Sequence, residues 1–176
     1  MNSIDSIISA IGVNIGTYRE DLDPLVMSLA IIGGGLAFGL MSGFVGTFLS
    51  ERAERIREFK EIERAIGKSL KSSIYGKVTV IVPVYVALMS SIGVIIFPTI
   101  LAAIYLLAYS NIISVGMAYT LTNIMSILIL LILGAYMAKI SGENILKSAL
   151  RVAALGLGAI IIVTIIKSLT IKILMP

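Results

Sequence analysis

Long apolar runs alternate with short charged segments along this chain. No charged residue occurs from Pro24 to Ser50, a run of 27 residues, or from Val78 to Ala138, a run of 61. A membrane-spanning helix needs roughly 20 consecutive apolar residues. The pattern therefore predicts an all-α integral membrane protein with several spanning helices.

The lengths of these runs predict five spans. They are expected at 2–18, Leu25–Ser50, 78–108, 112–138 and 148–171. A turn at 110–111 separates the third span from the fourth, and a polar loop at 139–147 precedes the last. The first stretch is short for a span, so four spans with an interfacial helix at 2–18 is the alternative.

Residues 51–77 differ from the rest because they hold eight Lys or Arg and five Glu. They predict a long amphipathic helix that extends the second span out of the membrane. The chain is thus expected to comprise two spans (1–50), this charged helix (51–77) and three further spans (78–176).

The distribution of basic residues predicts the orientation of the spans. Segments 51–77 and 139–151 hold eleven of the fourteen Lys and Arg, and both lie on one side in a five-span arrangement. Basic loops favour the cytoplasmic side. The sequence therefore predicts a multi-pass protein of the cell membrane with a cytoplasmic N-terminus and charged helix, and with its C-terminus outside.

Composition narrows the classes of function. The chain is 58% hydrophobic and 14% charged, which excludes an ordinary soluble domain. It contains no Cys and no His, so the commonest catalytic bases, nucleophiles and soft metal ligands are missing. We therefore expect no enzyme and no permanently bound cofactor. The net charge of +4 is attributed to basic loops rather than to nucleic-acid binding.

A ridge of small residues follows the second span. Gly35, Gly39, Gly43 and Thr47 recur every four residues, and Glu51 continues the same ridge. Such spacing lets helices approach closely in lipid. The ridge indicates helix packing, and an interface that also lines a transport path is the alternative. Asn123 and its neighbours Thr120, Thr122 and Ser126 are interpreted as interhelical hydrogen-bonding groups.

Two acidic features are candidates for metal chemistry. Glu51, Glu54, Glu58 and Glu61 fall within about 80° of arc on a helix. They are either partners in surface ion pairs or a cluster for a hard divalent cation, which prefers oxygen ligands. Asp5 is the acid of the first apolar stretch. It marks either a functional site or an exposed helix N-cap.

Taken together, these features resemble the vacuolar iron transporter family. The stretch GLAFGLMSGFVGTFLSERAERIREFKEIERAI (35–66) is similar to the family's second span, which continues into a carboxylate-rich cytoplasmic helix. The stretches NSIDSIISAIGVNIG (2–16) and GAYMAKISGENILKSALRVAALGLGA (134–159) resemble its first span and the link to its fifth.

The resemblance implies a homodimer that exports Fe²⁺ or Mn²⁺ from the cytoplasm by proton antiport. It matches Asp5 to the family's path aspartate and assigns the glutamate row to metal collection. The family's path methionine falls on Gly43 and its path glutamate on Thr47, with Met41 nearby. The rival hypothesis is a membrane scaffold or interaction module whose cytoplasmic helix docks a partner.

Overall fold

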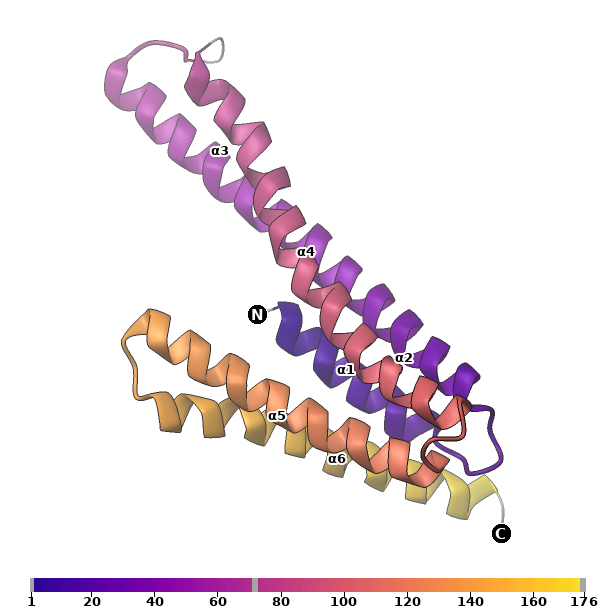
Figure 1. The fold of residues 1–176 in the computed structure, drawn as a ribbon. Helices are drawn as coiled ribbons and strands as arrows, with labels where there is room; N and C mark the ends of the chain where they lie inside the picture. Colours follow the sequence, from indigo (N-terminus) through magenta and orange to yellow (C-terminus); the bar gives the residue numbers. More distant parts are fainter. Residues whose placement is uncertain (1, 71–72, 175–176) are drawn as a thin grey trace.

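The computed structural model of the chain describes residues 2–70 and 73–174, and it is all-helical over these residues (Figure 1). The elements are α1 (Asn2–Thr17), α2 (Pro24–Gly39), η1 (Leu40–Gly46), α3 (Thr47–Ile66), α4 (Ile74–Tyr109), α5 (Val115–Ser141) and α6 (Ile145–Leu174). Lys71 and Ser72, which belong to the predicted charged helix, and the two ends of the chain lie outside the described residues.

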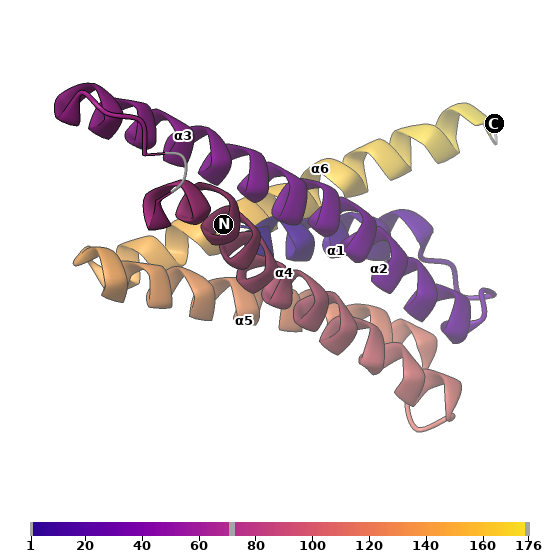
Figure 2. The same ribbon diagram turned by 90° about the horizontal axis from the view of Figure 1, so that it is seen from above.

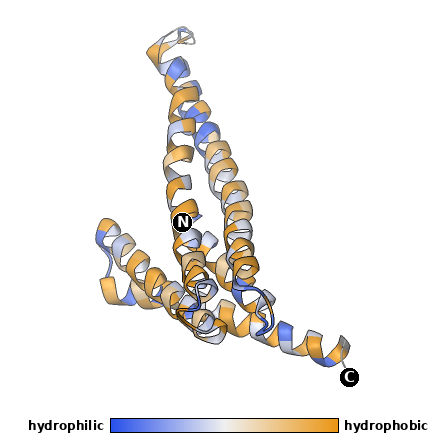
Figure 3. Cartoon of the chain, turned by 45° about the vertical axis from the view of Figure 1, so that its right-hand side comes forward, coloured by the Kyte–Doolittle hydropathy of each residue, from blue (hydrophilic) through white to orange (hydrophobic). Residues whose placement is uncertain are grey.

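Two long helical hairpins make up most of the molecule. The first consists of the unbroken helix Pro24–Ile66, which has 43 residues and a length of about 64 Å, and of α4, which returns along it. The second consists of α5 and α6. Figures 1 and 3 show the two hairpins diverging from one end of the molecule, and Figure 1 shows the start of α1 between them. We call α3 the charged arm.

Local chemistry accounts for the ends of the helices. Asp23 caps α2 by accepting a hydrogen bond from the backbone N–H of Leu25 at 2.8 Å, and Pro24 occupies the first turn. Gly67 and Gly142 end α3 and α5 with φ values of 70° and 72°. Asn111, with φ of 57°, forms the turn between α4 and α5. The predicted break at 110–111 is therefore confirmed.

Within residues 2–70 and 73–174, four helices are long and apolar enough to cross a membrane, namely Pro24–Ile66, Ile74–Tyr109, Val115–Ser141 and Ile145–Ile173. Figure 3 shows hydrophilic residues gathered along the charged arm and at helix ends. The fifth apolar helix, α1, has 16 residues and measures about 24 Å. The chain is thus a multi-pass membrane protein with four or five helices of this kind.

The structure divides the predicted charged helix. α3 ends at Ile66, and residues 74–77 already belong to α4. The reason is Gly67, whose left-handed conformation closes the helix by directing its N–H to the Glu63 carbonyl at 2.9 Å. The charged segment is therefore a helical hairpin rather than one long helix.

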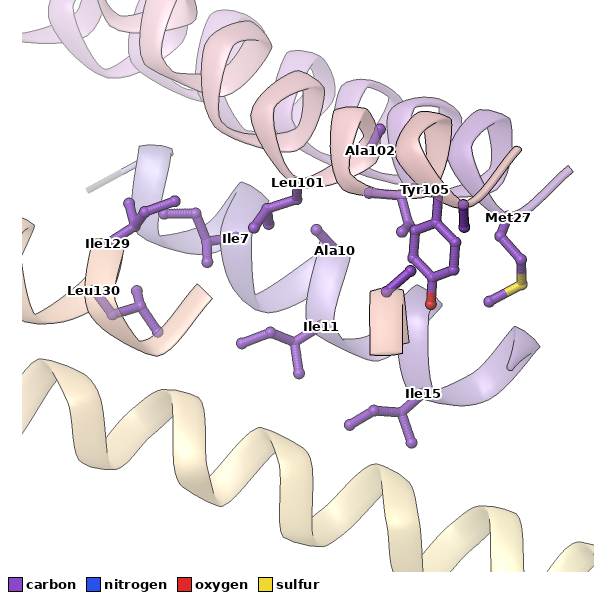
Figure 4. Packing of buried hydrophobic residues seen from close by; sticks show 13 residues of the cluster. Ile7, Ala10, Ile11, Ile15, Met27, Leu101, Ala102, Tyr105, Ile129 and Leu130 are labelled. Atoms are coloured by element: carbon purple, nitrogen blue, oxygen red, sulfur yellow. The ribbon is translucent and has the colours of Figure 1, made fainter. Parts of the chain in front are cut away.

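The hydrophobic core surrounds α1. Ile7, Ala10, Ile11 and Ile15 are each 0–1% exposed. Figure 4 shows Leu101 and Tyr105 of α4 above these residues and Leu130 of α5 to their left. A short helix with several faces buried is held by packing rather than by its own propensity. α1 therefore joins the two hairpins.

Candidate functional site

The small-residue ridge of the second span lies against α4. A Cβ atom built on Gly35 would lie 2.5 Å from Cγ of Pro98, and one on Gly39 would collide with Val94. A Cβ on Gly43 would lie 3.2 Å from both Val94 and Asn2. These three glycines therefore allow α2 and η1 to approach α4 and α1 closely, in the manner expected of small residues in lipid.

The helix that carries the ridge changes its backbone geometry where it meets α1. Residues Leu40–Gly46 form a π-helix, η1, in the middle of the rod that α2 and α3 extend. π-helical segments are uncommon, are usually shorter than this one and often occur at functional sites. η1 therefore makes the end of the glycine ridge the first candidate for a site.

Polar groups from four elements, α1, η1, α3 and α4, meet at this point. The side-chain amide of Asn2 donates to the carbonyl of Gly43 at 3.1 Å and to Oγ1 of Thr47 at 2.7 Å. The hydroxyl of Ser90 in α4 lies 3.4 Å from the same Thr47 oxygen. We call Asn2, Gly43, Thr47 and Ser90 the junction cluster. It gathers oxygen atoms, the ligand type that hard cations prefer.

Only part of the predicted transport path belongs to this cluster. Thr47 and Gly43 do, whereas Met41 has 70% of its surface exposed. Asp5 lies in the first turn of α1, is partly exposed, and forms no hydrogen bond or ion pair within 2–70 and 73–174. Because α1 already begins at Asn2, the alternative of an N-cap at Asp5 is wrong.

Three of the four glutamates in the row line a common hollow. Glu54, Glu58 and Glu61 line one open hollow of about 500 Å³ on the charged arm, together with Arg57. Glu51 does not line it and lies 3.8 Å from Arg55.

Three members of the row, Glu51, Glu58 and Glu61, are engaged in ion pairs on the arm. Glu58 accepts a hydrogen bond from Arg55 at 2.9 Å and Glu61 accepts one from Arg57 at 3.1 Å. In the described part of the chain, no group of three or more acidic side chains is close enough to hold a metal ion.

A second polar group lies deep in the bundle. Asn14 of α1 is fully buried, and its side-chain oxygen accepts a hydrogen bond from the Tyr105 hydroxyl at 2.6 Å. Its amide donates to Oδ1 of Asn123 at 3.1 Å. The interhelical bond predicted for Asn123 is thus confirmed. Thr120 and Ser126 instead donate to carbonyls of their own helix, those of Gly116 and Thr122.

The loop between α1 and α2 carries the clearest electrostatic perturbations outside the helices. Hydrogen bonds from Arg19 lower the pKa of Asp21, with Nη2 of Arg19 at 2.8 Å from the carboxylate. Burial, followed by the nearby Glu20 carboxylate, raises the pKa of the Tyr18 phenol. The loop therefore favours an ionised Asp21 and a neutral Tyr18.

Sequence reasoning missed Asn2, Ser90, Asn14 and Tyr105. Asn14 offered a signal, because an amide inside an apolar segment must find partners when it is buried. Asn2 and Ser90 offered none, since they lie far apart in the chain and neither belongs to a periodic polar pattern. Only the packing of α1 against η1 and α4 brings them together.

One relative was found by comparison with known proteins. The chain is 32% identical over 158 residues to "Uncharacterized protein MJ0645" of Methanocaldococcus jannaschii. The matched region covers 86% of this chain and 77% of that relative. No protein-family model and no solved structure matches the chain.

Proposed function

This chain belongs to the same family as the uncharacterized M. jannaschii protein MJ0645, and we propose that it transports divalent metal ions, Fe²⁺ or Mn²⁺, across a membrane. The direction is export from the cytoplasm, coupled to proton antiport. The resemblance of residues 35–66 to vacuolar iron transporters supports this proposal, and the junction cluster gives it a chemical basis.

The proposed topology has five spans, with α1 as the first. The N-terminus and the charged arm lie in the cytoplasm, and the C-terminus lies outside. This orientation places the Lys- and Arg-rich ends of both hairpins on the cytoplasmic side. The amphipathic arm then extends the second span into water. The protein acts as a homodimer within the bilayer.

The junction cluster is the observation on which the proposal rests. In hydrocarbon, irregular backbone and polar side chains are tolerated where they are buried in protein or line a water-filled path. Here the π-helical backbone lies beside three oxygen atoms, which are the carbonyl oxygen of Gly43 and the hydroxyl oxygens of Thr47 and Ser90. These neutral oxygens are weak ligands, which suits an ion that must also leave.

The acidic residues have separate roles in this proposal. Glu54, Glu58 and Glu61 attract cations to the cytoplasmic mouth, and Glu51 lies between them and the junction cluster. Asp5, in the first turn of α1, carries the coupling proton or binds the ion. Gly43 gives access to backbone oxygen, and Met41 plays at most a peripheral part because it faces outward.

A docking module is the second candidate, and the ion pairs of the charged arm favour it. Arg55 and Arg57 neutralise Glu58 and Glu61, as on an ordinary solvated helix. In this case the arm would bind a partner protein through its remaining cations, such as Lys60 and Arg64. Neither Mn²⁺ nor Fe²⁺ would then cross the membrane.

Flux of Mn²⁺ and Fe²⁺ into proteoliposomes tests the proposal, with and without a proton gradient. We expect Thr47→Val to lower the flux at least about tenfold, because it removes a ligand hydroxyl with little change of volume. Asp5→Asn should abolish the proton-driven component. Thr120→Val is the matched control, since that hydroxyl bonds only within α5, and it should retain the wild-type rate.

Absence of flux from folded wild-type protein would refute the transporter. Full flux in Thr47→Val would refute the path through the junction cluster. The docking module makes a different prediction: reversing the charges of Lys60 and Arg64 should impair function more than replacing Glu54, Glu58 and Glu61 with Gln. For a transporter, the glutamine variants should raise the apparent KM more than they lower the maximal rate.

A further inference from the structure

A mostly apolar cavity of about 520 Å³ lies between the end of α1 and the last turns of α6. Its walls include Tyr18, Arg19, Val163, Ile166, Lys167 and Thr170. We call it the Lys167 cavity. Cavities of this size with a few convergent polar groups are typical of sites for small organic ligands.

The ammonium group of Lys167 has a fixed position. It donates to the backbone carbonyl of Ile15 at 2.9 Å and to that of Tyr18 at 2.6 Å, and it lies 5.4 Å from the centre of the Tyr18 ring. An ammonium has three N–H donors, so one remains. Lys167 forms no ion pair with any residue in 2–70 or 73–174.

Arg19 adds a second cation with unused donors. Its Nε and Nη2 bind the carboxylate of Asp21 at 3.1 and 2.8 Å. A guanidinium has five N–H donors, so those of Nη1 remain available. A second ligand can therefore bind Arg19 without displacing Asp21.

The acidic and the basic residues of the loop between α1 and α2 line two different hollows. Glu20, Asp21 and Asp23 line a separate hollow of about 430 Å³ that faces the turn between α4 and α5. The Lys167 cavity has Arg19 and Lys167 on its wall, and no acidic residue lines it in the part of the chain that the structure describes. Its charge is therefore complementary to an anion.

The apolar part of the cavity belongs to an apolar helix with exposed side chains. Figure 2 shows the last turns of α6 projecting beyond the other helices. Ile166 and Ile171, on the cavity wall, are 57% and 50% exposed. A ligand that satisfies both parts of the wall needs an anionic head and a hydrocarbon tail.

We propose that the Lys167 cavity binds one phospholipid, with its phosphate at Lys167 and Arg19 and an acyl chain along Val163, Ile166 and Ile171. The bound phosphate accepts the remaining hydrogen bond of the Lys167 ammonium. It thereby stabilises the contact between α6 and the end of α1. This inference does not depend on metal transport.

Native mass spectrometry of the full chain tests the proposal, with phosphatidylglycerol and phosphatidylcholine as probes. Lys167→Met keeps the aliphatic stem and removes the charge, so it should weaken binding of one phosphatidylglycerol about tenfold, the typical effect of losing a charged hydrogen bond. Lys172→Met is the matched control, because Lys172 lies on α6 but not on the cavity wall. It should stay within about twofold of wild type.

Loss of lipid binding in Lys167→Met could also follow from misfolding, because Lys167 bonds to the end of α1. A second variant therefore leaves Lys167 unchanged. Arg19→Gln combined with Asp21→Asn removes one charge of each sign and leaves Lys167 in place, and it should also weaken phosphatidylglycerol binding. Unchanged binding in this variant, or equal loss in Lys172→Met, overturns the proposal. Competition by soluble glycerol phosphate also overturns it, since it would indicate a site for free phosphate. Equal binding of phosphatidylglycerol and phosphatidylcholine also overturns it, since Lys167 and Arg19 would then not select an anionic head.

Discussion

Polar residues are arranged differently on the charged arm and in the interior that surrounds α1. In the interior a few uncharged groups, such as Asn14 and Tyr105, are fully buried and bond across helices. On the arm many charged groups are exposed and pair with residues three or four positions away on the same helix. Each buried group therefore specifies how helices meet, whereas each exposed pair stabilises one helix slightly.

The largest effect is expected at Asn14. Asn14→Leu leaves the Tyr105 hydroxyl and the Asn123 carbonyl oxygen without this partner, so the free energy of unfolding should fall by about 3 kcal/mol. Denaturant titration in detergent micelles measures this change. Adding Tyr105→Phe to the variant should restore part of the loss. A loss below about 0.5 kcal/mol would mean that water replaces these hydrogen bonds. The buried polar groups would then contribute no more than the exposed ion pairs of the arm.

The next largest effect concerns the glycine ridge. Gly39→Ala places a methyl group against Val94, so it should destabilise the first hairpin by about 2 kcal/mol. Gly33→Ala is the control, since its added Cβ would meet no atom within 4 Å. The same titration should show Gly33→Ala to be neutral or stabilising, because alanine has the higher helix propensity. Equal losses in both would assign the effect to the backbone rather than to packing.

A much smaller effect is expected on the arm. Glu58→Gln removes an exposed ion pair with Arg55, so the unfolding free energy should change by no more than about 0.5 kcal/mol. The difference should disappear in high salt, which screens exposed charges. A loss as large as that of Gly39→Ala would instead place the arm against a partner.

The smallest effect is the titration of Asp21. Its pKa should lie below the ordinary value of 3.8, because Arg19 stabilises the carboxylate. The ion pair is therefore present above pH 3.8, and it is lost as the pH falls through the lowered value. Carboxyl NMR titration measures this, and Arg19→Gln should return the pKa toward 3.8. An unchanged pKa in Arg19→Gln would remove Arg19 as the cause.

Sequence reasoning placed the helices well, because apolar runs and turn residues are local signals. The predicted spans 112–138 and 148–171 correspond to Val115–Ser141 and Ile145–Leu174. It erred at residues 51–77, where the charge pattern continued past Gly67 and concealed the turn. The π-helix at Leu40–Gly46 was also missed, since those residues are as compatible with an α-helix.

The candidate site was less predictable than the helices. The ridge that leads to Thr47 follows from spacing alone, and so does the glutamate row. The partners of Thr47 do not, because no pattern within one helix states which residues of another helix it meets. Asn123 illustrates the limit: its need for a partner was evident, whereas the identity of that partner, Asn14, required the fold.

The π-helix accommodates one additional residue between the glycine ridge and the charged arm. Its hydrogen bonds join residues five apart instead of four, so five of its residues turn the chain about as far as four residues of an α-helix. Deleting one residue from Leu40–Gly46 would therefore allow this segment to become α-helical and would leave the arm at nearly the same rotation relative to Gly35 and Gly39. The segment can thus absorb the loss of one residue, while the glycines keep their contacts with α4 and the arm keeps its direction.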